Sequence, residues 1–180
     1  MKSVLVHSCC AHCAAYTVNY WRQQGYEVSS LWYNPNIHPY TEHQHRLLAM
    51  QSLAQEIKLP LVAVGGYDMI DYFRQVVGHE TERCQYCFRL RLAKTAEIAR
   101  QKGFDAFTTT LLISPHQKHD LIREIGDNVA RERGVDFLYA DLRKRYSESR
   151  HMTKPLDLYR QQYCGCVYSE WERHANEHQS

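Results

Sequence analysis

Seven cysteines carry most of the chemical information in this sequence. They stand in three groups, Cys9-Cys10-x-x-Cys13, Cys84-x-x-Cys87 and Cys164-Gly165-Cys166. Two residues between paired cysteines allow both thiolates to face one metal centre. Closely spaced thiols can also exchange with a disulfide. The three groups therefore predict a metal site, a redox-active thiol pair, or both.

The first two groups fit more than one metal. Structural zinc takes four ligands, commonly from two C-x-x-C pairs, and this sequence offers such a set in Cys10, Cys13, Cys84 and Cys87. That assignment leaves Cys9 without a role. An iron–sulfur cluster also takes about four thiolates and accepts less regular spacing. From the residues alone, zinc and iron–sulfur remain equal alternatives, and any single cysteine could instead be an inert buried side chain.

The third group favours thiol–disulfide chemistry. Gly165 removes the side chain that would obstruct a tight bend between Cys164 and Cys166. Two thiols in this arrangement can alternate between dithiol and disulfide, and so carry two electrons. The alternatives are two further metal ligands or two packing cysteines.

Other cofactor signals are weak. Eleven histidines are present, but His43/His45 and His116/His119 have no matching carboxylate pattern, so a surface or hydrogen-bonded role is the better interpretation. No glycine-rich phosphate loop follows the first predicted strand, where His7-Ser8-Cys9-Cys10 stands instead, and there is no G-x-G-x-x-G motif. The sequence therefore argues against ATP and dinucleotide chemistry.

Composition indicates an ordinary globular protein. The chain has 180 residues, 44% hydrophobic residues and a formal net charge of +2. No apolar run approaches the roughly 20 residues needed to span a bilayer, and the beginning MKSVLVHSCC is a poor signal peptide. We therefore predict one domain over residues 1–180, no membrane, and a cytoplasmic location, where thiols are normally reduced.

Strand-like and helix-like patterns alternate along the chain. Such alternation predicts an α/β fold with a parallel sheet flanked by helices. Thr41 is the predicted cap of the second helix. The expected strands cover 4–7, 27–33, 60–64, 104–110 and 135–142; the expected helices cover 11–24, 41–58, 68–77, 87–102 and 116–133, with a helical C-terminal part around the Cys164-Gly165-Cys166 turn.

The unusual loops all follow predicted strands. Ligands of open α/β sheets bind beyond the carboxyl ends of the strands. Cys9-Cys10 lies at such an end, as do residues 33–36, 65–68, 108–114 and 141–145. We therefore expect these loops to meet at one edge of the sheet.

Five motifs in this order resemble the QueH-type epoxyqueuosine reductases, and the resemblance runs from about Lys2 to Glu172. It implies a single-domain Rossmann-like fold related to PP-loop (HUP) proteins. It also implies reduction of epoxyqueuosine to queuosine at the wobble base of tRNAs with GUN anticodons, by an iron–sulfur enzyme without cobalamin. The motifs are His7-Ser8-Cys9-Cys10-Ala11, Tyr33-Asn34-Pro35-Asn36-Ile37, Arg83-Cys84-x-x-Cys87, Thr108-Thr109-Thr110-Leu111-Leu112-x-Ser114-Pro115 and Tyr159-Arg160-Gln161-x-Tyr163-Cys164-Gly165-Cys166.

The resemblance also implies roles for the cysteines. By position, Cys9, Cys10, Cys84 and Cys87 match the ligands of a [4Fe-4S] cluster, and Cys164 and Cys166 match the redox-active pair. Cys13 departs from the pattern, because relatives can carry an acidic residue there. It is either a ligand of an additional mononuclear iron or a residue without a metal role.

An anticodon base is read by stacking and hydrogen bonds, while cations hold the phosphates. Asp68, Asp141 and Tyr163 are candidate proton donors to the leaving oxygen, and the electron donor is not identified by the sequence. The predicted base-side contacts are Tyr33, Asn34, Asn36, Thr108–Thr110 (Thr109 at their centre) and Ser114; the predicted phosphate contacts are Arg83, Arg89, Arg91, Arg143, Lys144 and Arg145.

Three other functions compete with this one. An iron–sulfur enzyme that thiolates tRNA would usually need ATP to activate the base, and the missing phosphate loop argues against it. A zinc-stabilised RNA-binding module would be colourless and contain zinc alone. A simple thiol–disulfide exchanger would leave the first two cysteine groups unexplained.

Overall fold

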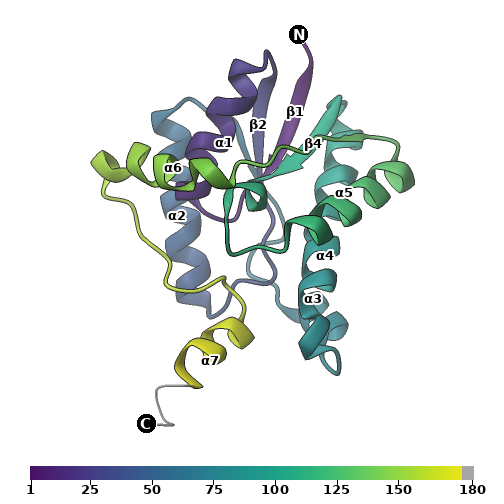
Figure 1. Ribbon diagram of the computed structural model, residues 1–180, viewed down its shortest axis with the longest axis vertical. Coiled ribbons are helices and arrows are strands. Elements are labelled where there is room, and N and C mark those ends of the chain that lie inside the picture. The colour runs from purple at the N-terminus through teal and green to yellow at the C-terminus, as the bar shows by residue number, and fades with distance from the viewer. Residues whose placement is uncertain (176–180) are drawn as a thin grey trace.

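The sheet is parallel throughout and has five strands. The computed structural model describes residues 1–175. The strands stand in the order β3-β2-β1-β4-β5, so β1 occupies the centre (Figure 1). The predicted α/β fold with a parallel sheet is therefore confirmed. The strands are β1 (Ser3–His7), β2 (Glu27–Trp32), β3 (Leu61–Ala63), β4 (Ala106–Thr109) and β5 (Asp136–Phe137).

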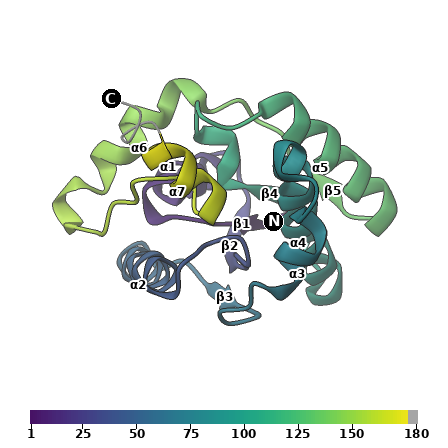
Figure 2. The same ribbon diagram turned by 90° about the horizontal axis from the view of Figure 1, so that it is seen from below.

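Helices follow most strands and cover both faces of the sheet. Alternate residues of β1 point to opposite faces: Val4 and Val6 pack into the hydrophobic core beneath α1 and α2, and Leu5 packs into the core beneath α4 and α5 (Figure 2). A central strand buried on both faces is typical of parallel sheets. The α-helices are α1 (Ala11–Gln23), α2 (Tyr40–Glu56), α3 (Ile70–Val76), α4 (Arg83–Lys102), α5 (His119–Arg133), α6 (Tyr146–Met152) and α7 (Val167–Ala175).

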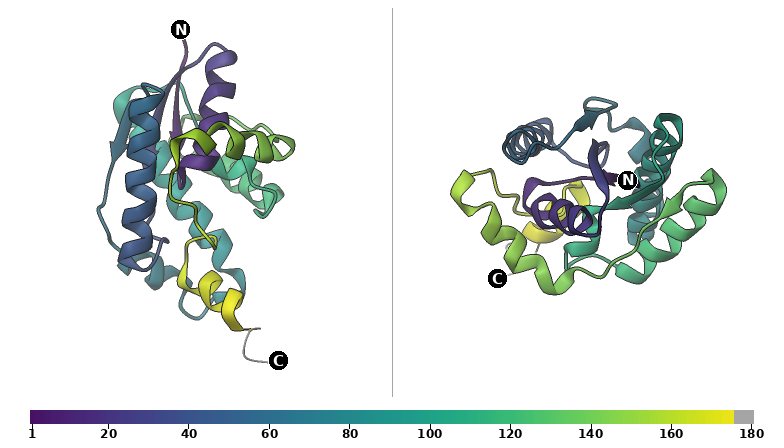
Figure 3. Two further views of the ribbon diagram at one scale, coloured as in Figure 1. Left: turned by 90° about the vertical axis from the view of Figure 1, so that its left-hand side faces the viewer. Right: turned by 90° about the horizontal axis from the view of Figure 1, so that it is seen from above.

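Short 3-10 helices connect several of these elements. They are η1 (Glu80–Glu82), η2 (Thr110–Ile113), η3 (Arg143–Arg145) and η4 (Lys154–Leu156). Between η4 and α7 the chain is irregular, and it runs beside α2 toward the lower end of the molecule (Figure 3). The C-terminal part is therefore helical on both sides of the Cys164-Gly165-Cys166 turn, as predicted, with α6 and η4 before the irregular segment that holds the turn and α7 after it.

Several predicted boundaries differ from the observed ones, and three of them concern α2, α4 and β5. Helix α2 begins at Tyr40 behind Pro39, and Thr41 is not its cap. Helix α4 begins at Arg83, so Cys84 lies inside it. Strand β5 covers only two residues. Just beyond it, the backbone N–H of Leu138 still donates to the carbonyl of Phe107 at 2.9 Å, and the Thr108 hydroxyl donates a hydrogen bond of 2.7 Å to the carbonyl of Leu138.

The carboxyl ends of the three central strands are level with one another. His7 is opposite Leu31 of β2 and Thr109 of β4 in the parallel register. The loops after β1, β2 and β4 therefore leave the sheet at one edge, as predicted. Within the part of the chain that the structure describes, no helix combines the length and the apolar character that crossing a membrane requires.

Candidate active site

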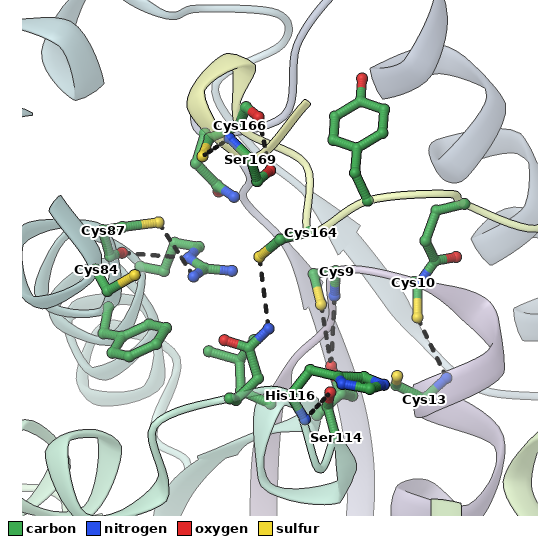
Figure 4. A pocket seen from close by; sticks show the side chains of 18 of the residues that line it. Cys9, Cys10, Cys13, Cys84, Cys87, Ser114, His116, Cys164, Cys166 and Ser169 are labelled. Atoms are coloured by element: carbon green, nitrogen blue, oxygen red, sulfur yellow. Dashed lines mark hydrogen bonds between the residues drawn. The ribbon is translucent and has the colours of Figure 1, made fainter. Parts of the chain in front are cut away.

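A single cavity of about 510 Å³ opens at this edge of the sheet and gathers all seven cysteines (Figure 4). Its wall comes from the β1–α1 loop, the first turn of α4, the loop after η2, and the irregular segment before α7. Segments far apart in the sequence therefore meet here. Besides the cysteines, the wall includes Asn36, Arg46, Tyr72, Arg83, Arg91, Ser114, His116, Gln117, Lys118, Arg150, Gln161, Tyr163 and Ser169.

The first cysteine group surrounds the beginning of α1. Cys10 is the N-cap of the helix, and its Sγ accepts a hydrogen bond of 3.3 Å from the backbone N–H of Cys13. The Cys9 Sγ lies 3.7 Å from the Thr110 hydroxyl. A hydrogen bond with Cys10 and burial raise the pKa of Cys9 well above its usual range, and a hydrogen bond with Cys13 together with burial raises the pKa of Cys10 to about 12. Without a cation these thiols stay protonated, so binding a metal must release protons.

The second group lies on the first turn of α4. Cys84 and Cys87 are three residues apart and therefore share one face of the helix. Burial raises the pKa of both thiols, that of Cys87 to about 12. One turn further along, Arg91 donates from Nη2 to the Cys87 Sγ at 3.2 Å and from Nε to the Cys87 carbonyl at 3.2 Å.

Arg91 is a buried cation in the wall of the cavity. Its side chain is 1% exposed, and none of the ion pairs among residues 1–175 includes it. A buried charge is costly unless an opposite charge compensates it. Its neighbours across the cavity wall are the sulfurs of Cys87 and Cys9, both of which influence its pKa. The site is therefore suited to an anionic group that includes thiolates.

The third group presents its two thiols differently. Cys164 is exposed, and its Sγ accepts a hydrogen bond of 3.5 Å from Gln117 Nε2. Cys166 is buried, and its Sγ accepts a hydrogen bond of 3.4 Å from the backbone N–H of Ser169. Burial alone would raise the pKa of Cys166, but Ser169, Tyr72 and Arg83 favour the thiolate strongly enough to lower it. Cys166 is thus the thiol of this pair whose surroundings stabilise a negative charge.

Several polar atoms around the cavity have no partner. Among residues 1–175, four buried side-chain polar atoms make no hydrogen bond, and three of them belong to cavity residues: Asn36 Oδ1, the Tyr72 hydroxyl and Arg83 Nε. Such atoms are rare because an unmade hydrogen bond costs about 1–3 kcal/mol. Tyr72 and Arg83 also favour the Cys166 thiolate, so among residues 1–175 Asn36 Oδ1 is the cavity atom that points to a polar occupant.

The structure separates the predicted substrate contacts into two sets. Asn36, Thr110 and Ser114 line the cavity. Tyr33, Asn34, Thr108, Thr109 and Arg143 do not. Asn34 and Thr109 are buried partners of His7, Tyr33 lines a small neighbouring pocket with Gly65 and Gly66, and Arg143 is paired with Asp141.

The predicted proton donors are also separated. Of Asp68, Asp141 and Tyr163, only Tyr163 lines the cavity. Its hydroxyl donates a hydrogen bond to the carbonyl of His38, and burial raises its pKa. The Arg143 guanidinium holds the pKa of the Asp141 carboxyl well below its usual range, outside the cavity.

The predicted phosphate contacts differ in their surroundings. Arg91 is buried in the cavity wall, where it donates to the sulfur of Cys87. Arg83, Arg89 and Arg145 are paired with Glu172, Glu132 and Glu148, respectively. Two cavity cations, Lys118 and Arg150, were not predicted, because neither lies beside a cysteine or in a charged run of the sequence.

The thiols do not gather around one point. Across residues 1–175, no three side chains of His, Cys, Asp or Glu are placed to hold a single metal ion. Five cysteines of the first two groups instead line opposite parts of one cavity (Figure 4). With the uncompensated charge of Arg91, this donor set fits a polynuclear thiolate-bound group, whose ligands bind different metal atoms.

Comparisons with known proteins agree with one another. A family model described as epoxyqueuosine reductase QueH matches residues 4–172. An epoxyqueuosine reductase QueH of Dehalococcoides mccartyi is 55% identical over 170 residues, which cover 94% of this chain and 93% of that protein. The QueH protein of Streptococcus pyogenes is 37% identical, with 93% of this chain and 70% of the relative covered. That of Thermotoga maritima is 35% identical, with 96% and 93% covered.

A solved structure supports the fold. The predicted subunit of a tRNA methyltransferase from Methanocaldococcus jannaschii is similar to this chain with a TM-score of 0.56, and 86% of this chain and 76% of the other are covered. The two sequences are 11% identical, so this likeness concerns architecture alone. It agrees with the Rossmann-like arrangement predicted from the sequence.

Proposed function

Because this chain belongs to the QueH family of epoxyqueuosine reductases, which convert epoxyqueuosine to queuosine in tRNA, we propose how its cysteines divide that reduction. Cys9, Cys10, Cys84 and Cys87 hold a [4Fe-4S] cluster, and Cys164 with Cys166 form the redox-active pair. The substrate is the wobble nucleoside of a tRNA with a GUN anticodon. The observation that carries this proposal is that all seven cysteines line one cavity, next to the buried Arg91, which donates to the Cys87 sulfur and makes no ion pair within residues 1–175.

The electron count of the reaction suits a dithiol. Converting the epoxide to an alkene breaks two C–O bonds and releases the oxygen as water, which consumes two electrons and two protons. Oxidation of Cys164 and Cys166 from dithiol to disulfide releases two electrons and two protons. An external electron donor must then restore the dithiol. Cys164, the exposed member of the pair, is the thiol that such a donor can reach.

The cluster ligands and the charged wall have separate tasks. Bound at the four cysteines, a [4Fe-4S] cluster would supply one-electron transfer. Lewis-acid polarisation of the epoxide oxygen would need an iron with an open coordination position. Arg91 compensates the negative charge of the thiolates from within the wall. Cys13 lies beside Cys10 at the beginning of α1, and we assign it to an additional mononuclear iron.

Residues of the cavity can bind the substrate nucleoside and its phosphates. Asn36 offers an unpartnered amide oxygen, and Ser114 a hydroxyl, to the edge of a base. Lys118 and Arg150 provide positive charge for phosphates. An anticodon base reaches this depth only if it is flipped out of its stack. Tyr33, Asn34, Thr109 and Arg143 lie behind or beside this wall, and we assign them to supporting the loops of the site.

The proposal is tested by separating cluster binding from turnover. The protein is reconstituted anaerobically with iron and sulfide, reduced, and incubated with epoxyqueuosine-containing tRNA, whose nucleosides are then quantified by mass spectrometry. The wild-type protein should convert epoxyqueuosine to queuosine, with loss of one oxygen. Cys164→Ser should keep its iron and lose turnover, whereas Cys84→Ser and Cys87→Ser should lose both.

Each part of the proposal can fail separately. Unchanged turnover of Cys164→Ser would remove the redox role of that residue, and loss of iron from it would make it a ligand. Colourless protein that contains zinc alone would contradict the cluster. Absence of conversion by reduced protein with an intact cluster would contradict the assigned reaction for this chain.

A further inference from the structure

Arg46 is the buried residue that connects helix α2 to the Cys164-Gly165-Cys166 segment. Its side chain is 1% exposed. The guanidinium donates from Nη1 to the carbonyl of Cys164 at 3.0 Å and from Nη2 to the carbonyl of Tyr163 at 2.9 Å. The third donor, Nε, lies 2.6 Å from Glu42 Oε1 one turn earlier on α2. One planar side chain therefore holds two consecutive backbone carbonyls and one carboxylate.

Glu42 is itself fixed by the same C-terminal segment. Its side chain is 7% exposed, and its second oxygen accepts a hydrogen bond from the hydroxyl of Tyr159. Breaking a buried ion pair by removing one partner is strongly destabilising, because the other charge is left unpaired. The pair is thus a rigid unit, and both of its members hold the segment between Tyr159 and Cys164.

The backbone of Gly165 packs closely against Arg46 and Ile37. Its φ is +138°, and a Cβ at this position would lie 3.1 Å from Ile37 Cγ1 and 3.3 Å from Arg46 Nη1. The Gly165 carbonyl also accepts a hydrogen bond of 2.8 Å from the backbone N–H of His38. The backbone of the Cys-Gly-Cys turn is therefore held from both sides.

In this conformation the two thiols have different hydrogen-bond partners. Cys164 Sγ accepts a hydrogen bond from Gln117, and Cys166 Sγ accepts one from the backbone N–H of Ser169 on the first turn of α7 (Figure 4). A disulfide requires the two Cβ atoms to approach to about 3.8 Å with a defined dihedral angle. Closing it means that at least one thiol leaves its partner and that the backbone of the turn adjusts.

We propose that Arg46 and Glu42 are positioning residues that hold the Cys164-Gly165-Cys166 turn in its dithiol conformation, so that the pair tends to return to the reduced state. This proposal rests on the redox role assigned to the two cysteines above. Loss of the clamp, the Glu42–Arg46 pair with its bonds to Tyr159, Tyr163 and Cys164, should make the disulfide easier to form. It should also expose Cys166.

The oxidation state of Cys164 and Cys166 can be measured separately from that of the other cysteines. Trypsin cleaves after Arg160 and Arg173, and the resulting peptide contains Cys164 and Cys166 but no other cysteine. The reconstituted protein is equilibrated in glutathione buffers of graded composition. In the reaction followed, the S–S bond of glutathione disulfide breaks, the Cys164–Cys166 bond forms, and two molecules of glutathione carry the electrons and protons away. Alkylation and mass spectrometry of the peptide give the oxidised fraction.

Two variants remove the clamp. Arg46→Gln removes the donors but leaves Glu42 buried and unpaired, so the double variant Glu42→Gln/Arg46→Gln is the better one for folding. In both we expect the equilibrium constant for disulfide formation to rise about fivefold or more, and alkylation of Cys166 by iodoacetamide to accelerate by a similar factor. Arg46→Lys, which retains the positive charge on a single nitrogen but loses the planar guanidinium, should give an intermediate value.

Arg22→Gln is the matched control. Arg22 donates to two backbone carbonyls, those of Ile57 at 2.9 Å and Lys58 at 3.2 Å, beyond the far end of α2. The chemical change is the same, but it does not touch the Cys-Gly-Cys turn. The control should leave the disulfide equilibrium and the alkylation rate of Cys166 unchanged.

The outcomes distinguish this proposal from the one on which it rests. If the wild-type protein and the variants never form the disulfide, the redox role fails, and faster alkylation of Cys166 in the double variant would still support the clamp. If a folded double variant keeps the wild-type equilibrium and alkylation rate, the clamp is refuted. An equal shift in Arg22→Gln would also refute it, because general loss of stability would then be sufficient.

Discussion

The Arg91 guanidinium lies 3.2 Å from the sulfur of Cys87, buried in the cavity wall and without a carboxylate partner among residues 1–175. An interaction of this kind with a charged group is worth about 1.5–3 kcal/mol. It stabilises the thiolate form of a ligand and, to a greater degree, the more negative reduced state of a bound cluster.

We therefore expect Arg91→Met to bind the cluster less firmly and to lower its midpoint potential by on the order of 60 mV or more. The measurement is a redox titration of the reconstituted protein followed by electron paramagnetic resonance. Arg89→Met is the control, because Arg89 lies on the same helix but is paired with Glu132 at the surface. Equal potentials in the two variants would show that Arg91 does not sense the cluster charge.

Tyr72→Phe should raise the pKa of Cys166. The Tyr72 hydroxyl is buried, makes no well-formed hydrogen bond, and lies close enough to Cys166 to help lower the pKa of that thiol. Removal of this one oxygen preserves the packing of the ring against Val76 and Cys87. The pH profile for alkylation of Cys166 should move up by about one pH unit, which corresponds to about 1.4 kcal/mol.

Tyr86→Phe is the control for this experiment. Tyr86 packs against the same hydrophobic cluster but does not line the cavity. The alkylation profile of Cys166 should not move in this variant. A profile that is also unchanged in Tyr72→Phe would mean that Ser169 and Arg83 suffice to stabilise the thiolate.

Much of this site can be predicted from the sequence, because the topology of the sheet determines which loops lie together. The alternating elements predict a parallel sheet, and the carboxyl ends of its strands must meet at one edge, which places Cys9 and Cys10 correctly. Like Lys118 and Arg150, Arg46 and Tyr72 were not predicted; these two lie on helices without a motif around them. Their role arises from contacts with the segment near Cys164, more than 90 residues further along the chain, and local patterns do not specify such contacts.

Some residues were predicted as substrate contacts but lie outside the cavity. Asn34 and Thr109 belong to motifs at strand ends, and the sequence suggested that they face a substrate. In the structure both hydrogen-bond the buried ring of His7, at 3.1 Å each. Polar residues at the end of a parallel strand can satisfy one another beneath the site as readily as a ligand above it, and residue type does not distinguish these positions.

Substitutions of Cys13 can distinguish a site that holds the cluster alone from one that also holds an additional mononuclear iron. If Cys13 binds a second iron, Cys13→Ala should lower the iron content by about one atom per chain and keep the four-iron cluster. Cys13→Asp should restore that iron, since a carboxylate is also an iron ligand. Iron and sulfide analysis with Mössbauer spectroscopy measures both. Identical iron content in all three proteins would leave Cys13 with only its structural place at the start of α1.

Gly165→Ala should impair the Cys-Gly-Cys turn directly. The substitution combines a positive φ, worth about 1–3 kcal/mol of strain, with a Cβ too close to Ile37 and Arg46. We expect a loss of unfolding free energy of about 2–4 kcal/mol by chemical denaturation, and at least a tenfold loss of turnover.

Gly134→Ala isolates the effect of φ in that comparison. Gly134 has a φ of +66°, ends α5, and has open space where a Cβ would be added. Its variant should lose about 1 kcal/mol and keep full turnover. If Gly165→Ala is no worse than Gly134→Ala in both measurements, close packing of the turn on Arg46 is not required.

His38 should make the attachment of α7 sensitive to acid. Its Nδ1 accepts a hydrogen bond of 3.3 Å from the backbone N–H of Val167, while its Nε2 is 3.0 Å from the carbonyl of Pro35 and donates to it in the neutral ring. Burial lowers the pKa of His38 below its usual value of 6.5. The unfolded chain therefore binds a proton at a higher pH than the folded chain does.

The sign of the effect follows from this difference in proton binding. Stability contributed by neutral His38 is complete above pH 6.5 and decreases as the pH falls toward the lowered pKa, by up to about 1.4 kcal/mol per pH unit. His38→Gln cannot titrate, so its unfolding free energy should fall less steeply below pH 6.5, and its Cys166 should be alkylated at a rate that depends less on acid. His45→Gln, at an exposed position of α2, is the control and should keep the wild-type slope. Parallel curves for wild type and His38→Gln would show that the acid sensitivity of the protein arises at other buried histidines, such as His7 and His12, whose pKa values burial also lowers.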